Sequence, residues 1–376
     1  MRVGVDVRYV RKKPAGIGSY VQAIATRMPA RAPDVQFTYF AHPDFQHAFG
    51  SAPNLRVLGA TGDPQGPVTM FAPSRLFPID DCDVFHSPQN ILGRGIRART
   101  VVTVHDLMWL LHPRLAERDP VLRTLGAPFF GRGAKYALRH ATRLIAVSRA
   151  TADEIVRFDP SLSTRVDVIP NAVDPFFAPP TDAASSRADA TRILGTDAAY
   201  FLVLGASQPY KDHPAALKAF AKVARGSERL VLVQRRGPKS ALYQLAVELG
   251  IASRVIWRDS LSREEVRSLL QNAVALVHPS RLEGFGLPVL EAMACGCPVV
   301  ATDIAALREV LGNAGSLAPL DDIASLGRAL RLFADSPHVR DEAREKGLLR
   351  AKTFDWDHAA EQTIAVYRQA LTTAPR

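Results

Sequence analysis

Two glutamates, Glu283 and Glu291, stand eight positions apart and enclose a segment that begins Gly-Phe-Gly-Leu-Pro. Gly284 and Gly286 let the backbone approach a ligand where a Cβ would clash. The proline that follows Leu287 is typical of the first turn of a helix, where its missing N–H leaves no hydrogen bond unmade. The sequence therefore predicts a helix that begins near Leu287. Its unpaired N–H groups and positive dipole end favour a phosphate in the glycine loop.

The two carboxylates predict hydroxyl groups on either side of that phosphate. Carboxylates repel phosphate, so Glu283 and Glu291 are better suited to accept hydrogen bonds from hydroxyls, one from the loop and one two turns along the helix. A ligand with a central phosphate and polyol groups at both ends is a sugar nucleotide. The alternative, two solvated glutamates on a helix, leaves the glycines, the proline and the following Gly-Cys-Pro-Val-Val strand entry unexplained.

The run from Glu283 to Val299, EGFGLPVLEAMACGCPV, resembles the E-x7-E signature of the family 4 retaining glycosyltransferases. The resemblance implies that Glu283 is catalytic and that its neighbours bind the donor nucleotide sugar: Ser280, Gly284, Phe285, Gly286, Leu287 and Glu291. It also implies that the anomeric configuration is retained. The acceptor hydroxyl would then attack from the face that the diphosphate leaves, and no enzymic base would be required.

A lysine follows a predicted strand in the second half of the chain. Lys211 lies in a loop that leads into a helix, where its charge would neutralise a diphosphate leaving group. It resembles the family's catalytic lysine, but Ala206 or Tyr210 stands where the family pattern has an arginine. Either Lys211 acts with less help, or Arg235 or Arg236 supplies the second charge to the donor. Losing a charge-assisted hydrogen bond would cost about 1.5–3 kcal/mol, which favours a substitute.

A glycine pair near the amino terminus opens the first expected helix. Gly16 and Gly18 begin a G-x-G pattern, but Val21 stands where a dinucleotide fingerprint needs its third glycine, which argues against a nicotinamide enzyme. The turn resembles the family's first-lobe loop, which approaches the donor phosphates and the acceptor. The alternative is a tight turn with no ligand.

Histidines stand at the carboxyl ends of two expected strands. His105 resembles the family histidine near the primary hydroxyl of the donor sugar, and we expect it in the catalytic set. Asp106 either lies on the acceptor side or caps the next helix. His86 is a further acceptor-side candidate, since its strand is expected to end at the same cleft.

Short apolar runs alternate with helical patterns in both halves of the chain, which predicts two α/β domains with parallel sheets. The expected strands are 2–7, 35–40, 83–86, 100–104, 143–147, 166–169, 200–205, 229–233, 254–258, 274–277 and 298–301. The expected helices include 17–29, 121–141, 149–157 and 356–371. The Pro-, Ala- and Ser-rich stretch 170–186 is typical of a connector.

This alternation resembles the GT-B architecture of the family, in which two Rossmann-like, doubly wound lobes face a central cleft and the C-terminal helix crosses back to the first lobe. The resemblance implies an acceptor-side N-terminal lobe over residues 1–172, on which a helix over 356–376 packs. It implies a nucleotide-sugar-binding lobe over residues 173–355.

Length and composition agree with two globular domains. The chain has 376 residues, of which 47% are hydrophobic and 22% charged, and single cores stop growing at about 250–300 residues. No segment approaches a membrane span of about 20 apolar residues, and the first residues already form an expected strand. We therefore expect a cytoplasmic protein. Three cysteines give no zinc-site spacing, and the Asp80-Asp81-Cys82-Asp83 run is typical of a turn, so no metal is expected.

The net charge of +10 is concentrated in the first half, where residues 1–175 hold 22 basic and 15 acidic side chains. Such a basic face attracts phosphates or an anionic membrane surface, or is only a solvated face. Nucleic acid is not expected, because the basic stretches lack interleaved aromatic residues and show no helix-turn-helix or zinc-finger spacing. A peripheral position at the inner membrane is therefore one expectation for the first lobe.

The predicted reaction is a metal-independent transfer of a hexose from a nucleotide sugar, with GDP-mannose favoured as the co-substrate and no further cofactor. The acceptor is expected to be a saccharide or a lipid-linked compound in the synthesis of surface polysaccharide or glycolipid. Three alternatives remain open at this point: a hydrolase with Glu283 and Glu291 as its acid–base pair, a sugar-nucleotide epimerase, and a non-catalytic nucleotide-sugar-binding protein.

Overall fold

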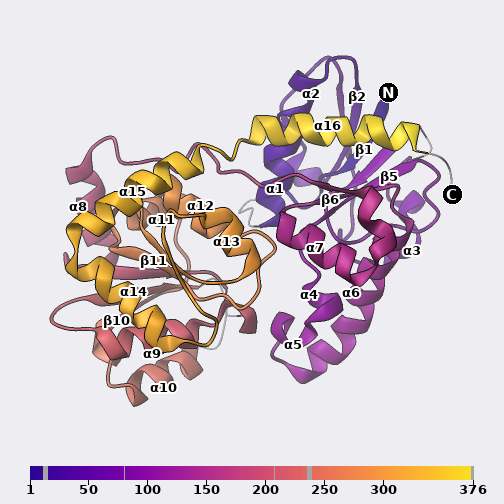
Figure 1. Ribbon diagram of the computed structural model, residues 1–376. Helices are drawn as coiled ribbons and strands as arrows, with labels where there is room; N and C mark the ends of the chain where they lie inside the picture. Colours follow the sequence, from indigo (N-terminus) through magenta and orange to yellow (C-terminus); the bar gives the residue numbers. More distant parts are fainter. Residues whose placement is uncertain (12–15, 80, 207, 235–238, 374–376) are drawn as a thin grey trace. The chain divides into compact units, whose positions relative to one another are not determined.

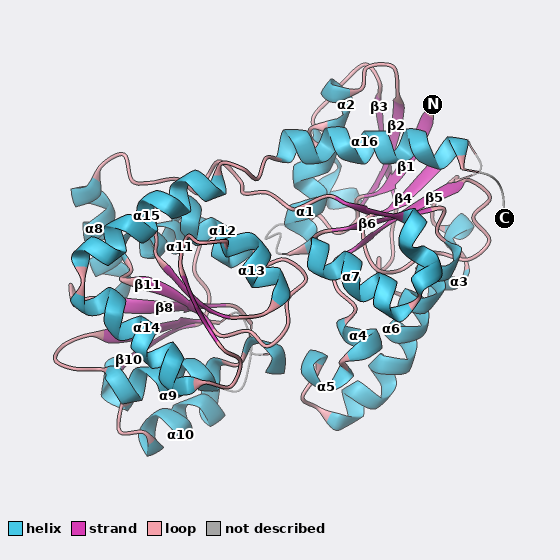
Figure 2. Cartoon of the chain, viewed as in Figure 1, coloured by secondary structure: helices cyan, strands magenta, loops and turns pink. Residues whose placement is uncertain are grey.

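The computed structural model describes residues 1–11, 16–79, 81–206, 208–234 and 239–373 (Figure 1). The chain divides into two compact units. The first comprises Met1–Pro113, Asp119–Ala172 and Asp355–Arg376, and the second comprises Arg114–Arg118 and Val173–Phe354. Each unit contains its own parallel sheet with helices packed around it (Figure 2), which confirms the predicted α/β, doubly wound fold class.

The sheet of the first unit has seven strands in the order β3-β2-β1-β4-β5-β6-β7. Its central strands are buried along almost their whole length, as expected for parallel strands covered on both faces. The sequence does not predict β3, because this edge strand is partly exposed and has no continuous apolar run. The strands are β1 (Arg2–Asp6), β2 (Gln36–Ala41), β3 (Leu55–Gly59), β4 (Val84–Ser87), β5 (Arg99–Val104), β6 (Arg143–Ala146) and β7 (Val166–Val168).

The sheet of the second unit has six strands in the order β10-β9-β8-β11-β12-β13. The carboxyl ends of β8, β9 and β11 are therefore neighbours at one edge of the sheet. The sequence does not predict β13, which is only three residues long. The strands are β8 (Tyr200–Leu204), β9 (Arg229–Val233), β10 (Val255–Arg258), β11 (Ala275–His278), β12 (Val299–Thr302) and β13 (Ser316–Ala318).

Helices and short 3-10 turns connect these strands. In the first unit they are α1 (Ile17–Ala25), α2 (Met28–Arg31), η1 (Pro43–Phe49), α3 (Pro67–Phe71), η2 (Pro73–Arg75), α4 (Met108–Leu111), α6 (Pro120–His140), α7 (Arg149–Phe158), η3 (Pro160–Arg165) and α16 (Trp356–Thr372). In the second they are α8 (Ala183–Leu194), η4 (Pro209–Lys211), α9 (His213–Val223), α10 (Lys239–Glu248), η5 (Ala252–Arg254), α11 (Arg263–Asn272), α12 (Leu287–Ala294), α13 (Ala305–Leu311), α14 (Ile323–Asp335) and α15 (Pro337–Ala351); α5 (Pro113–Ala116) has residues in both units.

The expected helix over 17–29 is interrupted. The structure ends α1 at Ala25 and starts the separate α2 at Met28, with Pro29 in its first turn. A proline inside a continuous helix would remove a backbone hydrogen bond and clash with the preceding turn, whereas the first turn tolerates it.

The C-terminal helix α16 is part of the first unit and contacts α1, α2, β4, β5 and β6 (Figure 1). Asp355 caps its amino end by accepting a hydrogen bond from the N–H of Asp357 at 2.8 Å. Arg31 of α2 pairs with Glu361 of α16 at 2.6 Å, and Tyr367 on its inner face is fully buried. The last helix of the chain is thus part of the first unit's core.

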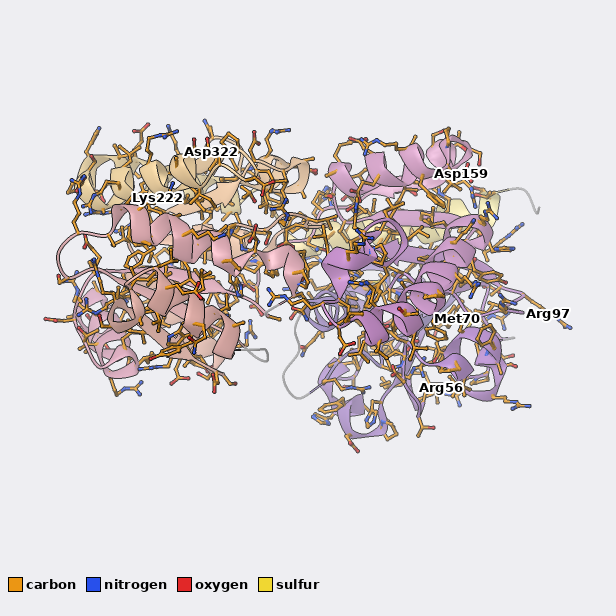
Figure 3. The ribbon with its side chains drawn as sticks, turned by 90° about the horizontal axis from the view of Figure 1, so that it is seen from below. Arg56, Met70, Arg97, Asp159, Lys222 and Asp322 are labelled. Atoms are coloured by element: carbon orange, nitrogen blue, oxygen red, sulfur yellow. The ribbon has the colours of Figure 1, made fainter. Side chains whose placement is uncertain are left out.

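Side chains of the first unit separate as expected between core and surface. Figure 3 shows Arg97 extending away from the ribbon, whereas Met70 is 3% exposed and lies within it. None of the helices in the described part of the chain is both long enough and apolar enough to span a bilayer.

Candidate active site

Lys211 and Glu283 meet at the carboxyl edge of the second sheet. Lys211 ends the turn η4 after β8, and its Nζ lies 2.7 Å from Oε1 of Glu283. The lysine stem runs past Gly205, whose φ is +133° and where an added Cβ would stand 3.4 Å from the lysine Cε. The positive φ favours glycine at this turn, whereas an added Cβ would only reach van der Waals contact with the lysine stem.

His278, at the end of β11, is the third residue of this cluster. Its Nε2 donates to Oε1 of Glu283 at 2.9 Å, and the hydroxyl of Ser280 lies 3.2 Å from the same nitrogen. Both Ser280 and His278 are buried. The acceptor role of the carboxylate fixes the proton on Nε2, since a carboxylate oxygen cannot donate.

Electrostatics keep the pair charged. Burial alone would raise the pKa of Glu283, but the ammonium of Lys211 and the hydrogen bond from His278 outweigh it and hold the pKa well below its ordinary range. Burial would likewise lower the pKa of Lys211, but the charge of Glu283 outweighs it and raises the pKa. Burial lowers the pKa of His278, so this ring stays neutral. The cluster therefore offers one buried ammonium, one buried carboxylate and one neutral imidazole N–H donor.

The predicted helix start at Leu287 is confirmed, since α12 begins at this residue. Its N-cap, Gly286, has φ +107°, and an added Cβ would lie 2.7 Å from Cδ2 of Leu307. A side chain at this position would be strained and would also collide with α13. Phe285 is 4% exposed and its ring makes an edge contact with Phe354 at 5.7 Å, so it packs in the interior of the unit.

The remaining predicted residues around the signature fall into two groups. Glu291 lies within α12 and Gly284 in the loop before it, and both are partly exposed. Arg235 and Arg236, the predicted substitutes for the family arginine, lie outside the described residues.

In the first unit, the backbone geometry fixes the tautomer of His105. Its Nε2 lies 3.0 Å from the carbonyl oxygen of Pro88, which can only accept, so this nitrogen carries the proton. Burial lowers the pKa of His105 to about 4, so the ring is neutral at pH 7. The lone pair on Nδ1 can then accept a hydrogen bond from a hydroxyl group. The backbone N–H donates to Oδ1 of Asn90 at 2.8 Å, and Tyr20 makes an edge contact with the ring at 4.9 Å.

Asp106 caps the turn that follows. Its Oδ1 accepts from the N–H of Met108 at 2.9 Å, at the start of α4. The N-cap of α4 is Leu107, so Asp106 makes its hydrogen bond from the turn one residue before the cap.

His86 lies in the interior of the first unit, and this corrects the expectation that it faces an acceptor. The residue is fully buried, and its ring nitrogens are hydrogen-bonded to the hydroxyl of Tyr367 at 2.7 Å and to Oγ1 of Thr103 at 2.8 Å. Burial lowers its pKa to about 3. His86 therefore connects β4 to α16 and β5, where no acceptor sugar can reach it.

The glycine pair of the first unit begins α1 as expected. Gly16 is the N-cap with φ +53°, and no atom lies within 4 Å of the position of an added Cβ, whereas Gly18 is buried. The positive φ accounts for a glycine at position 16 by itself.

Sequence reasoning did not identify two groups that the structure brings to the second unit's site. Arg281, just before the signature, pairs with Asp212 at 3.1 Å and also with Asp321. His213 and Gln234 are buried and hydrogen-bonded to each other at 3.0 Å. A charged residue two positions before Glu283 was the available signal for Arg281; the Asp321 contact depends on a loop 40 residues further along.

No group of three or more His, Cys, Asp or Glu side chains that could hold a metal ion is present among the residues that the structure describes. The three cysteines are free and buried.

Two family models match the chain. The model described as "Glycosyl transferases group 1" matches residues 188–350, and the model described as "Glycosyltransferase Family 4" matches residues 14–176. An MMP alpha-(1->4)-mannosyltransferase of Mycolicibacterium hassiacum is 34% identical over 314 residues, covering 77% of this chain and 71% of that protein. O-antigen chain mannosyltransferase B of Escherichia coli is 28% identical over 289 residues, which cover 76% of this chain and 74% of that protein.

Solved structures share the fold. WaaG, a glycosyltransferase involved in lipopolysaccharide biosynthesis, superposes with a TM-score of 0.72 at 19% identity over 96% of this chain and 98% of its own. HepE of Anabaena, solved in complex with UDP and glucose, gives a TM-score of 0.72 at 18% identity over 98% of this chain and 100% of its own. These likenesses show the GT-B fold and, at this identity, nothing further.

Proposed function

We propose, starting from the fact that this chain belongs to glycosyltransferase family 4, that it transfers a hexose from a nucleotide sugar to a saccharide or lipid-linked acceptor with retention of the anomeric configuration. Its being a glycosyltransferase follows from the family. The donor, the acceptor, the stereochemistry and the independence from metal are our proposal.

The observation that carries the proposal is the buried Lys211–Glu283 pair beside the first residues of α12. Breaking a bond to a nucleoside diphosphate builds negative charge on the leaving oxygen. Fixed donors that are already in place at that oxygen stabilise the transition state without reorganisation. Lys211 and the positive dipole end of α12 are assigned to the diphosphate, since Pro288 has no N–H and the N–H of Val289 donates to the carbonyl of Gly286. Glu283 is assigned to the hydroxyls of the sugar.

His105 and the stereochemistry complete the assignment. The Nδ1 lone pair of His105 is assigned to a hydroxyl of the donor sugar, since the contact with Pro88 keeps the proton on Nε2. In the proposed retaining mechanism the leaving phosphate oxygen takes the acceptor proton, so the chain need supply no general base. Because the ammonium and the dipole of α12 are assigned the charge stabilisation, the proposal requires no metal ion.

GDP-mannose is the favoured donor because two relatives of this chain are named as mannosyltransferases. UDP-glucose is the competing donor, since HepE was solved with UDP and glucose. The names of the O-antigen relative and of WaaG favour an acceptor in surface polysaccharide synthesis. The basic bias of the first 175 residues favours one that carries phosphate or lies at an anionic membrane.

A two-step assay tests the proposal. Thermal unfolding is first measured with GDP, UDP and ADP, because a ligand that binds only the folded protein raises its stability with the logarithm of its concentration over the dissociation constant. The matching nucleotide sugar is then supplied with candidate acceptors in the presence of EDTA, and NMR reads the anomeric configuration of the product. An α-linked product from an α-linked donor is expected.

Other products would contradict the proposal in distinct ways. Free sugar released without acceptor would indicate a hydrolase, and a changed donor sugar without acceptor would indicate an epimerase. Tight donor binding with no turnover against any acceptor would indicate a binding protein.

A further inference from the structure

Two strained residues of the second unit bind the same guanidinium. Among the residues that the structure describes, Asp212 and Asp321 are the two non-glycine residues with positive φ, at 45° and 67°. L-residues avoid this region, although aspartate tolerates it better than most. Nη1 of Arg281 lies 3.1 Å from Oδ2 of Asp212, and its Nη2 lies 2.9 Å from Oδ2 of Asp321, with a second contact between Nη1 and Oδ1 of Asp321.

Arg281 also holds the residue on the other side of Lys211. Its backbone N–H donates to the carbonyl of Tyr210 at 2.7 Å. Lys211 therefore stands between Tyr210 and Asp212, and both of these residues are bound by Arg281. The side chain of Arg281 ties the loop after β8 to the loop after β11, and through Asp321 to the loop after β13. This last loop leads into α14, which Asp322 caps by accepting a hydrogen bond from the N–H of Ser325.

Stability alone gives a weak account of this arrangement. The side chain of Asp321 is 66% exposed and that of Arg281 is 30% exposed. A single exposed ion pair contributes about 0–1 kcal/mol to folding, and a bidentate pair such as this one contributes more but remains partly screened by water. Strained backbone persists where the surrounding structure determines it and gathers at functional sites. Here both strained residues converge on the loop that carries the buried ammonium.

We propose that Arg281 and Asp321 are positioning residues that hold Lys211 at the place where it meets the diphosphate of the donor. This inference rests on the proposed function, which assigns the diphosphate to Lys211. Asp321 orients the guanidinium, the guanidinium fixes Asp212, and the backbone N–H of Arg281 fixes Tyr210. The residues before and after Lys211 are thereby both fixed, and with them the position of its side chain.

The sign of one effect separates positioning from simple electrostatics. Asp321→Asn removes a negative charge near an anion site, so electrostatics alone would tighten the binding of a diphosphate. Loss of positioning would instead weaken it, by up to about fivefold for an exposed pair. We expect weaker binding of UDP and GDP, measured by isothermal titration calorimetry with unchanged stoichiometry. A loss of folded protein would lower the stoichiometry and leave the dissociation constant unchanged. Unchanged or tighter binding in Asp321→Asn overturns the proposal.

Three further variants test the guanidinium, the backbone strain and the carboxylate charge separately. Arg281→Gln is expected to weaken binding about tenfold or more, because a misplaced Lys211 would lose its charge-assisted hydrogen bond to the diphosphate. Asp321→Gly relieves the positive φ but removes the pair, and is expected to bind as weakly as Asp321→Asn. Asp321→Glu keeps the charge and is expected to restore most of the affinity. Recovery in the glycine variant would assign the effect to backbone strain and overturn the role of the pair.

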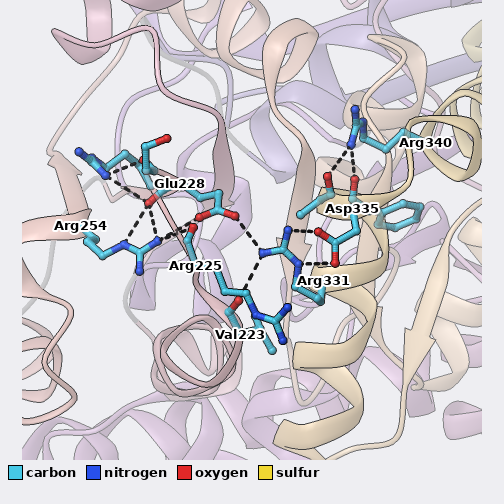
Figure 4. Close-up of polar contacts among 11 residues, drawn as sticks. Val223, Arg225, Glu228, Arg254, Arg331, Asp335 and Arg340 are labelled. Carbon is cyan, nitrogen blue, oxygen red and sulfur yellow. Dashed lines mark hydrogen bonds and ion pairs between the residues drawn. The ribbon is translucent and has the colours of Figure 1, made fainter.

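Asp335 provides a matched control. Its carboxylate accepts from Nε of Arg331 at 2.7 Å and its side chain is 53% exposed, so it forms a similar Arg–Asp pair in the same unit (Figure 4). This pair joins a network with Glu228 and Arg254. Asp335→Asn is expected to bind both nucleotides as the unchanged protein does. A loss equal to that of Asp321→Asn would show that any exposed pair of this unit has the same effect.

A crystallographic readout separates failure of this inference from failure of the proposed function. If the unchanged protein binds none of GDP, UDP and ADP, the proposed function fails. The positioning is still tested by crystal structures of the unchanged protein and of Asp321→Asn. We expect Nζ of Lys211 to move from its 2.7 Å contact with Glu283 in the variant. An unmoved lysine overturns the inference without reference to any nucleotide.

Discussion

The first unit should lose free energy of unfolding between neutral pH and pH 5. Replacing His86 with glutamine is expected to reduce that loss by about 2 kcal/mol. Burial lowers the pKa of His86 from 6.5 to about 3 in the folded protein. The unfolded chain therefore binds one more proton than the folded chain between these two values. The stabilising effect of the neutral ring is fully present above pH 6.5 and is lost as the pH falls towards 3. At pH 5 the loss covers 1.5 pH units, or about 2 kcal/mol at about 1.36 kcal/mol per unit.

The assay compares two proteins at two pH values. Hydrogen exchange of the β4 and β5 amides, corrected for the intrinsic rate at each pH, gives the free energy of opening of this unit. His86→Gln lowers that free energy at pH 7.5, because contacts with Tyr367 and Thr103 are lost. Between pH 7.5 and pH 5, however, the variant should lose about 2 kcal/mol less than the unchanged protein. Other titrating groups act in both proteins and cancel.

The control is an exposed histidine of the same unit, His47, whose replacement by glutamine should leave the acid sensitivity as it is in the unchanged protein. An equal loss in His86→Gln and in the unchanged protein would refute the reasoning. The buried ring would then either be protonated in the folded state or remain neutral in the unfolded chain.

Two further substitutions test the second unit. Lys211→Ala should lower kcat by about 10²–10³, the effect of removing one fixed donor from a developing charge, while circular dichroism stays unchanged; full activity in a donor-hydrolysis and transfer assay would contradict the assignment. Gly286→Ala places a methyl group 2.7 Å from a leucine at φ +107° and should destabilise the unit by about 1–3 kcal/mol in thermal unfolding. Gly195→Ala, at φ +72° with no atom within 4 Å, adds strain without the collision, and a loss as large as that of Gly286→Ala would contradict this account.

Most strands that the sequence predicts are buried on both faces, although it also predicts the partly exposed edge strands β7 and β10. β8 and β11 read as continuous apolar runs because helices cover them on each side, and this pattern is visible without any partner. β3 and β13 lie at sheet edges, where exposure interrupts the run and length falls to as few as three residues. Their pairing is determined by neighbouring strands and leaves little trace in their own composition.

In the site, too, features set by neighbouring residues could be predicted from the sequence, whereas features set by distant residues could not. The helix start at Leu287 follows from the glycine just before it and the proline just after it, so the sequence was sufficient to predict it. The burial of His86 depends in part on Tyr367, 281 positions away, whose hydroxyl is hydrogen-bonded to the ring. Position at a strand's carboxyl end predicts the edge of the sheet at which a side chain lies. Whether that side chain is covered depends on an element elsewhere in the chain.

The contacts of Glu283 explain how Lys211 can serve a diphosphate without leaving a buried charge unpaired. Removing one partner of a buried ion pair normally costs several kcal/mol, because the other charge remains uncompensated. Oε1 of Glu283 accepts from two donors, Nζ of Lys211 and Nε2 of His278. If a diphosphate takes the ammonium, the imidazole N–H still holds the carboxylate, and a sugar hydroxyl can take the place of the lysine. In this account His278 allows the lysine to change partners, so its replacement by phenylalanine should weaken nucleotide-sugar binding even where the ammonium is kept.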